Sequence, residues 1–140
     1  MIRFILLSTL LLCSHVFAHT EQNPLLGTWY FISGEYTAED GKVTKVDNSK
    51  FKALRTHSDN NFSAINMGMG EYKGFIEGSY TLKYDSHTLT GTIIEKPLKS
   101  SGKHLIGKTL KFDFVINGDI WTTQGQESNV YIKEVWQKLD

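Results

Sequence analysis

The sequence predicts an all-β protein with a single up-and-down antiparallel β-barrel of eight to nine strands. Polar and apolar residues alternate along most of the chain, and turn residues interrupt the alternation at short intervals. No window of a dozen residues has a convincing helical period. Hairpin-linked strands in this number are suited to closing on themselves, because closure removes the exposed edges.

Each run of alternation between two turn signals is interpreted as one strand. The expected strands are residues 27–36, 42–46, 51–56, 61–66, 78–84, 88–96, 109–116, 120–125 and 129–137. Asn117-Gly118 predicts a type I′ hairpin turn with positive φ at both central positions, and Asp40-Gly41 predicts a similar turn. Segments 67–70 and 99–103 are expected to be flexible loops. A short turn near residues 22–26 is expected to cap the base of the barrel.

The first 18 residues have the pattern of a signal peptide. A positive start at Arg3, an apolar stretch and a small-residue exit predict cleavage after Ala18, which leaves residues 19–140 as one barrel domain. The apolar stretch is too short for a membrane span. Cleavage would also remove Cys13, the only cysteine, which otherwise raises the alternative of lipidation. A domain without disulfides is more typical of a bacterial periplasm than of animal secretion, so we expect a periplasmic or secreted bacterial protein.

Charge argues against a nucleic-acid partner. The 15 basic and 15 acidic side chains balance, and no basic block is present. After residue 18 no segment is apolar enough to span a membrane. The expected protein is therefore neutral and exported, without a membrane span.

Alternation assigns the side chains that point into the barrel. The inward set is expected to be Trp29, Phe31, Ser33, Glu35, Tyr80, Leu82, Tyr84, Leu110, Phe112, Phe114, Ile116, Trp121, Thr123, Val130, Ile132, Glu134 and Trp136. Most of these residues need no functional explanation, because a barrel needs a core. The polar members are Glu35, Glu134 and the two tyrosine hydroxyls, which are interpreted as rim residues or as members of an internal network. Arg55 is the only arginine after Arg3, and at the barrel mouth it could hold a ligand carboxylate.

Several short motifs resemble those of lipocalins and their calycin relatives. Gly27-Thr28-Trp29 resembles the start of the first lipocalin strand, and Glu134-Val135-Trp136 is similar to the last. With Gly78-Ser79-Tyr80 and Gly118-Asp119-Ile120-Trp121, most of the chain resembles small bacterial lipocalin-like exported proteins. The resemblance implies a barrel and, more loosely, ligand binding. Lys138 stands where lipocalins usually have an arginine over the first-strand tryptophan, and the helix pair of fatty-acid-binding proteins is missing between residues 36 and 51.

No common catalytic motif occurs, and the histidines have no metal-ligand spacing, so neither a cofactor nor a metal is expected. An N-terminal His19 after cleavage could chelate copper only if a second histidine met it. A barrel enzyme of isomerase or cyclase type would need a carboxylate and a tyrosine in one cavity, and Glu134 with Tyr80 is the pair to test.

The leading hypothesis is an exported protein that binds a small apolar or amphipathic molecule inside the barrel. The alternatives are a filled barrel whose segment 67–70, with Tyr72 and Phe75, contacts an envelope protein, and the barrel enzyme. The expected ligand-binding residues are Tyr80, Trp121, Glu134, Arg55, Phe112 and Phe114, and the expected structural motif is Gly27, Trp29, Trp136 and Lys138. An internal cavity would favour a binder or an enzyme over the filled barrel.

Overall fold

The computed structural model of the chain describes residues 22–139. The expected signal peptide over residues 1–18, its cleavage site after Ala18, Cys13 and His19 lie outside the described residues. Among residues 22–139, no helix has the length and apolar character that crossing a bilayer requires.

The described chain is built almost entirely of antiparallel strands. These are β1 (Gly27–Ala38), β2 (Val43–Asp47), β3 (Phe51–His57), β4 (Asn61–Gly68), β5 (Glu71–Asp85), β6 (Thr90–Ser100), β7 (Leu110–Asn117), β8 (Ile120–Glu127) and β9 (Val130–Lys138), with a short 3-10 helix, η1 (Lys103–Leu105), between β6 and β7.

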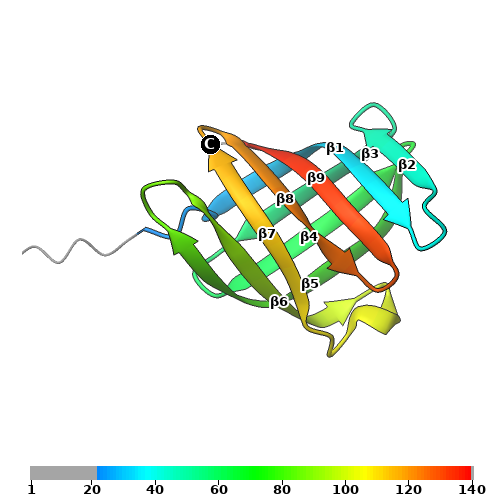
Figure 1. Cartoon of the computed structure of the whole chain (residues 1–140). Helices are drawn as coiled ribbons and strands as arrows, with labels where there is room; N and C mark the ends of the chain where they lie inside the picture. Colours follow the sequence, from blue (N-terminus) through cyan, green and yellow to red (C-terminus); the bar gives the residue numbers. More distant parts are fainter. Residues whose placement is uncertain (1–21, 140) are drawn as a thin grey trace, which may run out of the picture.

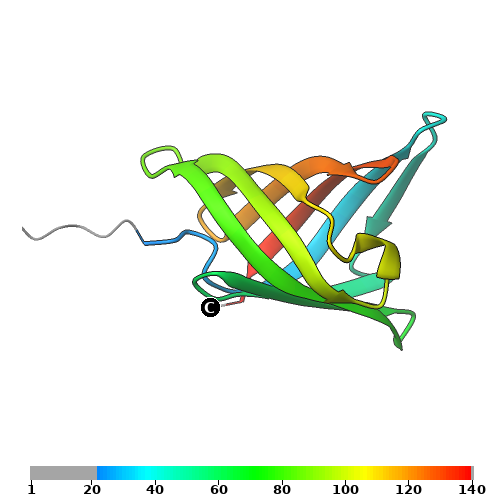
Figure 2. The same cartoon turned by 90° about the horizontal axis from the view of Figure 1, so that it is seen from below.

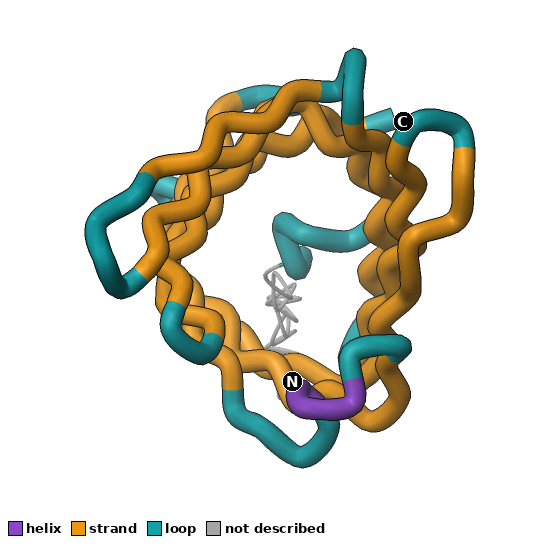
Figure 3. Tube along the Cα trace, turned by 90° about the vertical axis from the view of Figure 1, so that its right-hand side faces the viewer, coloured by secondary structure: helices purple, strands orange, loops and turns teal. Residues whose placement is uncertain are grey.

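The strands close into a barrel in sequence order. Neighbours run β2-β1-β3-β4-β5-β6-β7-β8-β9, and β9 pairs back onto β1. Eight strands, β1 and β3 to β9, therefore form the ring, seen from two sides in Figures 1 and 2 and along its axis in Figure 3. The predicted up-and-down barrel is confirmed, with β2 as an additional strand.

The additional strand marks one end of the barrel. Residues 27–30 of β1 pair with β3, whereas residues 33–37 pair with β2, so the β1–β2 hairpin projects beyond β3 (Figure 1). The β4–β5 turn and η1 lie at the same end, which we call the mouth (Figure 1). The opposite end, where residues 22–26 and the β7–β8 turn lie, is the base.

All nine predicted strands are present, but two loop predictions and one turn prediction differ from the structure. Segment 67–70 is not a flexible loop, because β4 extends to Gly68 and β5 begins at Glu71. Met69 and Gly70 form the tight turn between them, with φ values of 52° and 80°. Lys99 and Ser100 likewise belong to β6. The β7–β8 turn is shifted by one residue, since Asn117 pairs with Ile120 and leaves Gly118 and Asp119 at the centre. Only Gly118 has positive φ, 58°, as in a type II′ turn.

A β-bulge in β1 reverses the inward and outward faces that were expected for the residues beyond it. Phe31 pairs with Trp136 but Ser33 pairs with Val135, so Ile32 is an extra residue on β1. Trp29 and Phe31 point inward as predicted, each 0% exposed. Beyond the bulge, Gly34 and Tyr36 line the interior, and the prediction that Ser33 and Glu35 do so was wrong. The Glu35 carboxylate instead lies outside, 3.1 Å from Lys45 Nζ.

The segment before β1 closes the base, as predicted for residues 22–26. Pro24 and Leu25 form a turn that places the Leu25 side chain, 0% exposed, inside the barrel. Trp29 Nε1 donates a hydrogen bond of 2.8 Å to the Leu25 carbonyl. From β9, Lys138 Nζ lies 5.4 Å from the centroid of the Trp29 ring.

Tyr80 and His57 lie inside the barrel, next to the residues that close the base. The Tyr80 hydroxyl donates to the Ser58 carbonyl and accepts from Asn23 Nδ2, both at 2.6 Å. His57 is 2% exposed, its ring packs against Tyr80 and Trp121, and neither ring nitrogen has a hydrogen-bond partner among the described residues. Burial, and then the charge of Arg55, lower the pKa of His57 well below its usual value.

We expect His57 to make the protein sensitive to mild acid. The unfolded chain takes up a proton near pH 6.5 and the folded chain does not, so the free energy of unfolding falls as the pH drops below this value. Between pH 7.5 and 5.5 the loss should be on the order of 1 kcal/mol. His57→Phe should remove this loss in urea titrations at the two pH values, whereas exposed His87→Asn should retain it. Equal pH dependence in all three proteins would contradict the prediction.

Candidate functional site

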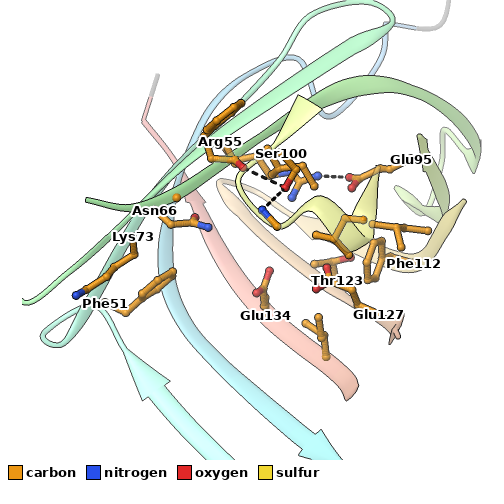
Figure 4. A pocket seen from close by; sticks show the side chains of 18 of the residues that line it. Phe51, Arg55, Asn66, Lys73, Glu95, Ser100, Phe112, Thr123, Glu127 and Glu134 are labelled. Carbon is orange, nitrogen blue, oxygen red and sulfur yellow. Dashed lines mark hydrogen bonds and ion pairs between the residues drawn. The ribbon is translucent and has the colours of Figure 1, made fainter. Parts of the chain in front are cut away.

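The barrel encloses a cavity of about 530 Å³ between the base and the mouth. Its apolar walls consist of Val46, Phe51, Ala64, Phe75, Ile76, Leu105, Leu110, Phe112, Trp121, Ile132 and Trp136. Its polar lining consists of Tyr36, Arg55, Asn66, Lys73, Glu95, Ser100, Ser101, Thr123, Glu127 and Glu134. Figure 4 shows eight of these polar side chains, which belong to β3, β4, β5, β6, β8 and β9.

The cavity reaches solvent at the mouth. Lys73 and Glu127 lie at the mouth ends of β5 and β8, and exposed Ser101 follows β6. At the other end, Leu25 and Trp29 fill the barrel. A molecule could therefore enter only from the mouth.

Glu134, on β9, accepts two side-chain hydrogen bonds in the cavity. Its Oε1 accepts a hydrogen bond of 2.9 Å from the Tyr36 hydroxyl, and its Oε2 accepts one of 3.1 Å from Trp136 Nε1. Gly34 makes the first bond possible, because the Tyr36 ring folds back over it. A Cβ at position 34 would lie 2.6 Å from the Tyr36 hydroxyl oxygen.

Burial changes the proton affinity of these groups. It raises the pKa of Glu134, an effect that the hydrogen bond from Tyr36 and the charge of Arg55 oppose. Burial, and then the neighbouring Glu134, raise the pKa of Tyr36, so the phenol keeps its proton. Glu127 also has a raised pKa, first because of burial and then because of Glu95.

Arg55 lies deep in the barrel and not near the mouth, where it was expected. It pairs across the sheet with Trp29 and Ala64, and its guanidinium makes an ion pair with Glu95. The side chains of Arg55 and Glu95 are 13% and 3% exposed. The guanidinium also lies 4.8 Å from the centroid of the Phe62 ring. Glu95 therefore occupies the position that a ligand carboxylate would need.

The structure separates the expected site residues into two groups. Trp121, Glu134, Arg55 and Phe112 line the cavity, and Trp136 lines it beside Glu134. Tyr80 and Phe114 are buried in the core and do not line the cavity. The expected pair of Glu134 and Tyr80 in one cavity is therefore not formed. Gly27, Trp29 and Lys138 belong to the base. Tyr84 also lies toward the base, where its hydroxyl donates to the Gln22 carbonyl over 3.2 Å.

Sequence reasoning missed Tyr36, Glu95 and Glu127. Alternation could have found Glu95, because it shares a face with Ile93 and Pro97, which are both fully buried. Tyr36 could not have been found in this way, since the bulge reverses its face. Glu127 lies beyond the expected strand 120–125, whereas β8 extends to it.

The comparisons with known proteins add two similar structures. No protein-family model and no curated protein matches the chain. An uncharacterized protein from Bacteroides eggerthii is 23% identical, with a TM-score of 0.49 over 81% of this chain and 98% of that one. A lipocalin-like protein from Bacteroides uniformis is 21% identical, with a TM-score of 0.43 over 82% and 98%. The closed, eight-stranded, up-and-down barrel of the present chain is itself lipocalin-like.

The Arg55–Glu95 pair gives a prediction about stability. Arg55→Met should lower the free energy of unfolding by about 3 kcal/mol, because it leaves Glu95 buried without its partner. Arg55→Met with Glu95→Leu should recover most of the loss. Lys45→Met breaks the exposed pair with Glu35 and should cost less than about 1 kcal/mol. Urea unfolding measures all three, and a double variant no more stable than Arg55→Met would contradict the account.

A second prediction concerns the space that Gly34 leaves for the Tyr36 ring. Gly34→Ala should displace the Tyr36 ring and remove its hydrogen bond, so that the pKa of Glu134 rises further. Tyr36→Phe should raise this pKa in the same direction, and the double variant should add little. Carboxyl ¹³C NMR titration of Glu134 measures the shift. An unchanged pKa in Gly34→Ala, or additive shifts, would contradict the geometry.

Proposed function

We propose that this chain is an exported binding protein that holds a small apolar or amphipathic molecule inside its barrel. The cavity is the observation that carries the proposal. Its volume of about 530 Å³ lies within the range of roughly 300–1,000 Å³ that is typical of ligand pockets. In such pockets the apolar walls provide affinity, and the polar groups set the orientation of the ligand.

The distribution of packing along the barrel supports the same function. A barrel that served only as a scaffold could be filled with side chains along its whole length. Here the aromatic and aliphatic packing is concentrated at the base, whereas the half toward the mouth has polar groups facing an accessible space. Export rests on the sequence pattern of residues 1–18, and we propose a periplasmic or secreted location on that basis.

One observation favours a second candidate, the barrel enzyme. Tyr36 and Glu134 meet in the cavity over 2.9 Å, and so a phenol and a carboxyl group of raised pKa adjoin the same space. Such a pair can transfer a proton to and from a bound substrate. The filled-barrel alternative has no such observation in its favour, because the interior contains a cavity. Of the contact surface expected for it, Met69 and Tyr72 are exposed.

Filling the cavity should abolish binding without unfolding the protein. We expect N-phenyl-1-naphthylamine, a neutral apolar dye, to gain fluorescence in the wild-type barrel. Ala64 lines the cavity, and Ala64→Phe should weaken dye binding at least tenfold, because the new ring occupies the ligand volume.

Ser63→Phe is the matched control, because Ser63 is the exposed neighbour on the same strand. It adds the same ring outside the barrel and should leave dye binding unchanged. Circular dichroism and thermal melting establish that both variants are folded. Equal dye affinity in folded Ala64→Phe and in the wild type would contradict binding in this cavity.

A further inference from the structure

We propose that the cavity selects an organic cation: an amphipathic amine whose ammonium group lies beside Glu134, with Glu127 nearer the mouth of the same cavity, and whose apolar part contacts the barrel walls. This inference rests on the proposed binding function and adds the chemical class of the ligand. It follows from the charges of the cavity, its aromatic walls and its volume.

Both cations that line the cavity already have a carboxylate partner. Among its lining residues the positive charges are Arg55 and Lys73. Arg55 makes its ion pair with Glu95, and Lys73 Nζ lies 3.0 Å from Glu71 at the mouth. A ligand carboxylate would have to displace Glu95 and would also face Glu127 and Glu134. The charge distribution therefore opposes an anionic ligand.

Two carboxyl groups, in contrast, lack a cationic partner. Neither Glu127 nor Glu134 makes an ion pair with any residue of the described range 22–139. Tyr36 and Trp136 direct single hydrogen bonds to the two oxygens of Glu134. A carboxylate has about four acceptor sites, so Glu134 is held in place and can still accept hydrogen bonds from an ammonium group.

The walls beside these carboxyl groups suit a cation with an apolar body. Phe51, Phe112, Tyr36 and Trp136 line the same cavity, and aromatic faces attract ammonium groups. Trp121 also lines it and is 1% exposed, and it adds a further aromatic face to the cavity.

A metal ion does not fit these observations. Within residues 22–139, no three histidine, cysteine, aspartate or glutamate side chains are placed to hold a metal. A cavity of about 530 Å³ that apolar and polar side chains line together is also much larger than a metal site needs. An organic cation uses the carboxyl groups and the apolar walls together.

Proton linkage gives the proposal a distinctive signature. Because burial raises the pKa of both Glu127 and Glu134, ammonium binding favours their ionised forms and releases protons. The affinity for an amine should therefore rise with pH between 5 and 8, a range in which an alkylamine stays protonated. A neutral ligand of the same length should show no such increase.

The test compares decylamine, 1-decanol and decanoate, which share a ten-carbon chain and differ in the charge of the head group. Competition with N-phenyl-1-naphthylamine in low salt, below the micellar concentrations, measures the affinity of each. At pH 7.5 we expect decylamine to bind at least tenfold more tightly than decanoate, with decanol between them. The affinity for decylamine should also increase from pH 5 to 8.

Two variants assign the effect to the cavity. Glu134→Gln and Glu127→Gln should each weaken decylamine binding at least threefold, leave decanol binding unchanged and flatten the pH dependence. Glu35→Gln removes the same charge from the outer face of β1 and is the matched control, which should bind decylamine like the wild type. If one cavity variant does not fold, the other still tests the assignment.

The outcomes separate this inference from the function on which it rests. If decanol and decanoate bind and decylamine has no advantage, the cation proposal is wrong and the binding function stands. If the dye and all three probes fail to bind the folded protein, both are wrong. A preference for decylamine that Glu35→Gln reduces as much as the cavity variants would also overturn the proposal, because general surface charge would then explain it.

Discussion

The pairing of β1 with β9 closes the barrel, and the bulge within that pairing determines what the barrel contains. Before the bulge, Trp29 and Phe31 point inward and complete the base; beyond it, Gly34 and Tyr36 replace Ser33 and Glu35 on the inner face. Without the extra residue, the Tyr36 hydroxyl would point away from Glu134. One backbone irregularity therefore places the Tyr36 phenol in the cavity beside Glu134.

Stability and recognition accordingly reside at opposite ends of the same strands. At the base, Trp29 and Leu25 exclude water, and His57 stays neutral among aromatic rings. In the cavity above the base, the charges of Arg55 and Glu95 compensate each other, and Glu127 and Glu134 make no ion pair within residues 22–139. Under the proposed binding function, ligand specificity can change through the residues of the cavity while the base retains the fold.

The barrel could be predicted from the sequence because period-two alternation and turn residues act locally. The same reasoning also predicted that the Trp121 and Phe112 side chains face inward. The site could be predicted only in part, for physical reasons. Alternation cannot show the bulge that places Tyr36 on the inner face. A shift of one residue reverses the face of every residue beyond it. Nor can alternation show that Arg55 is neutralised by Glu95, since these two residues meet only across the closed barrel.

Binding of a small molecule is the central claim, and native mass spectrometry of the protein, purified without refolding from the cells that make it, tests it most directly. The account predicts one extra mass per chain that is retained under native conditions, lost on denaturation, and identified as a molecule with an apolar body. A protein that shows only its own mass, and acquires none from an extract of small molecules and lipids, would contradict the account.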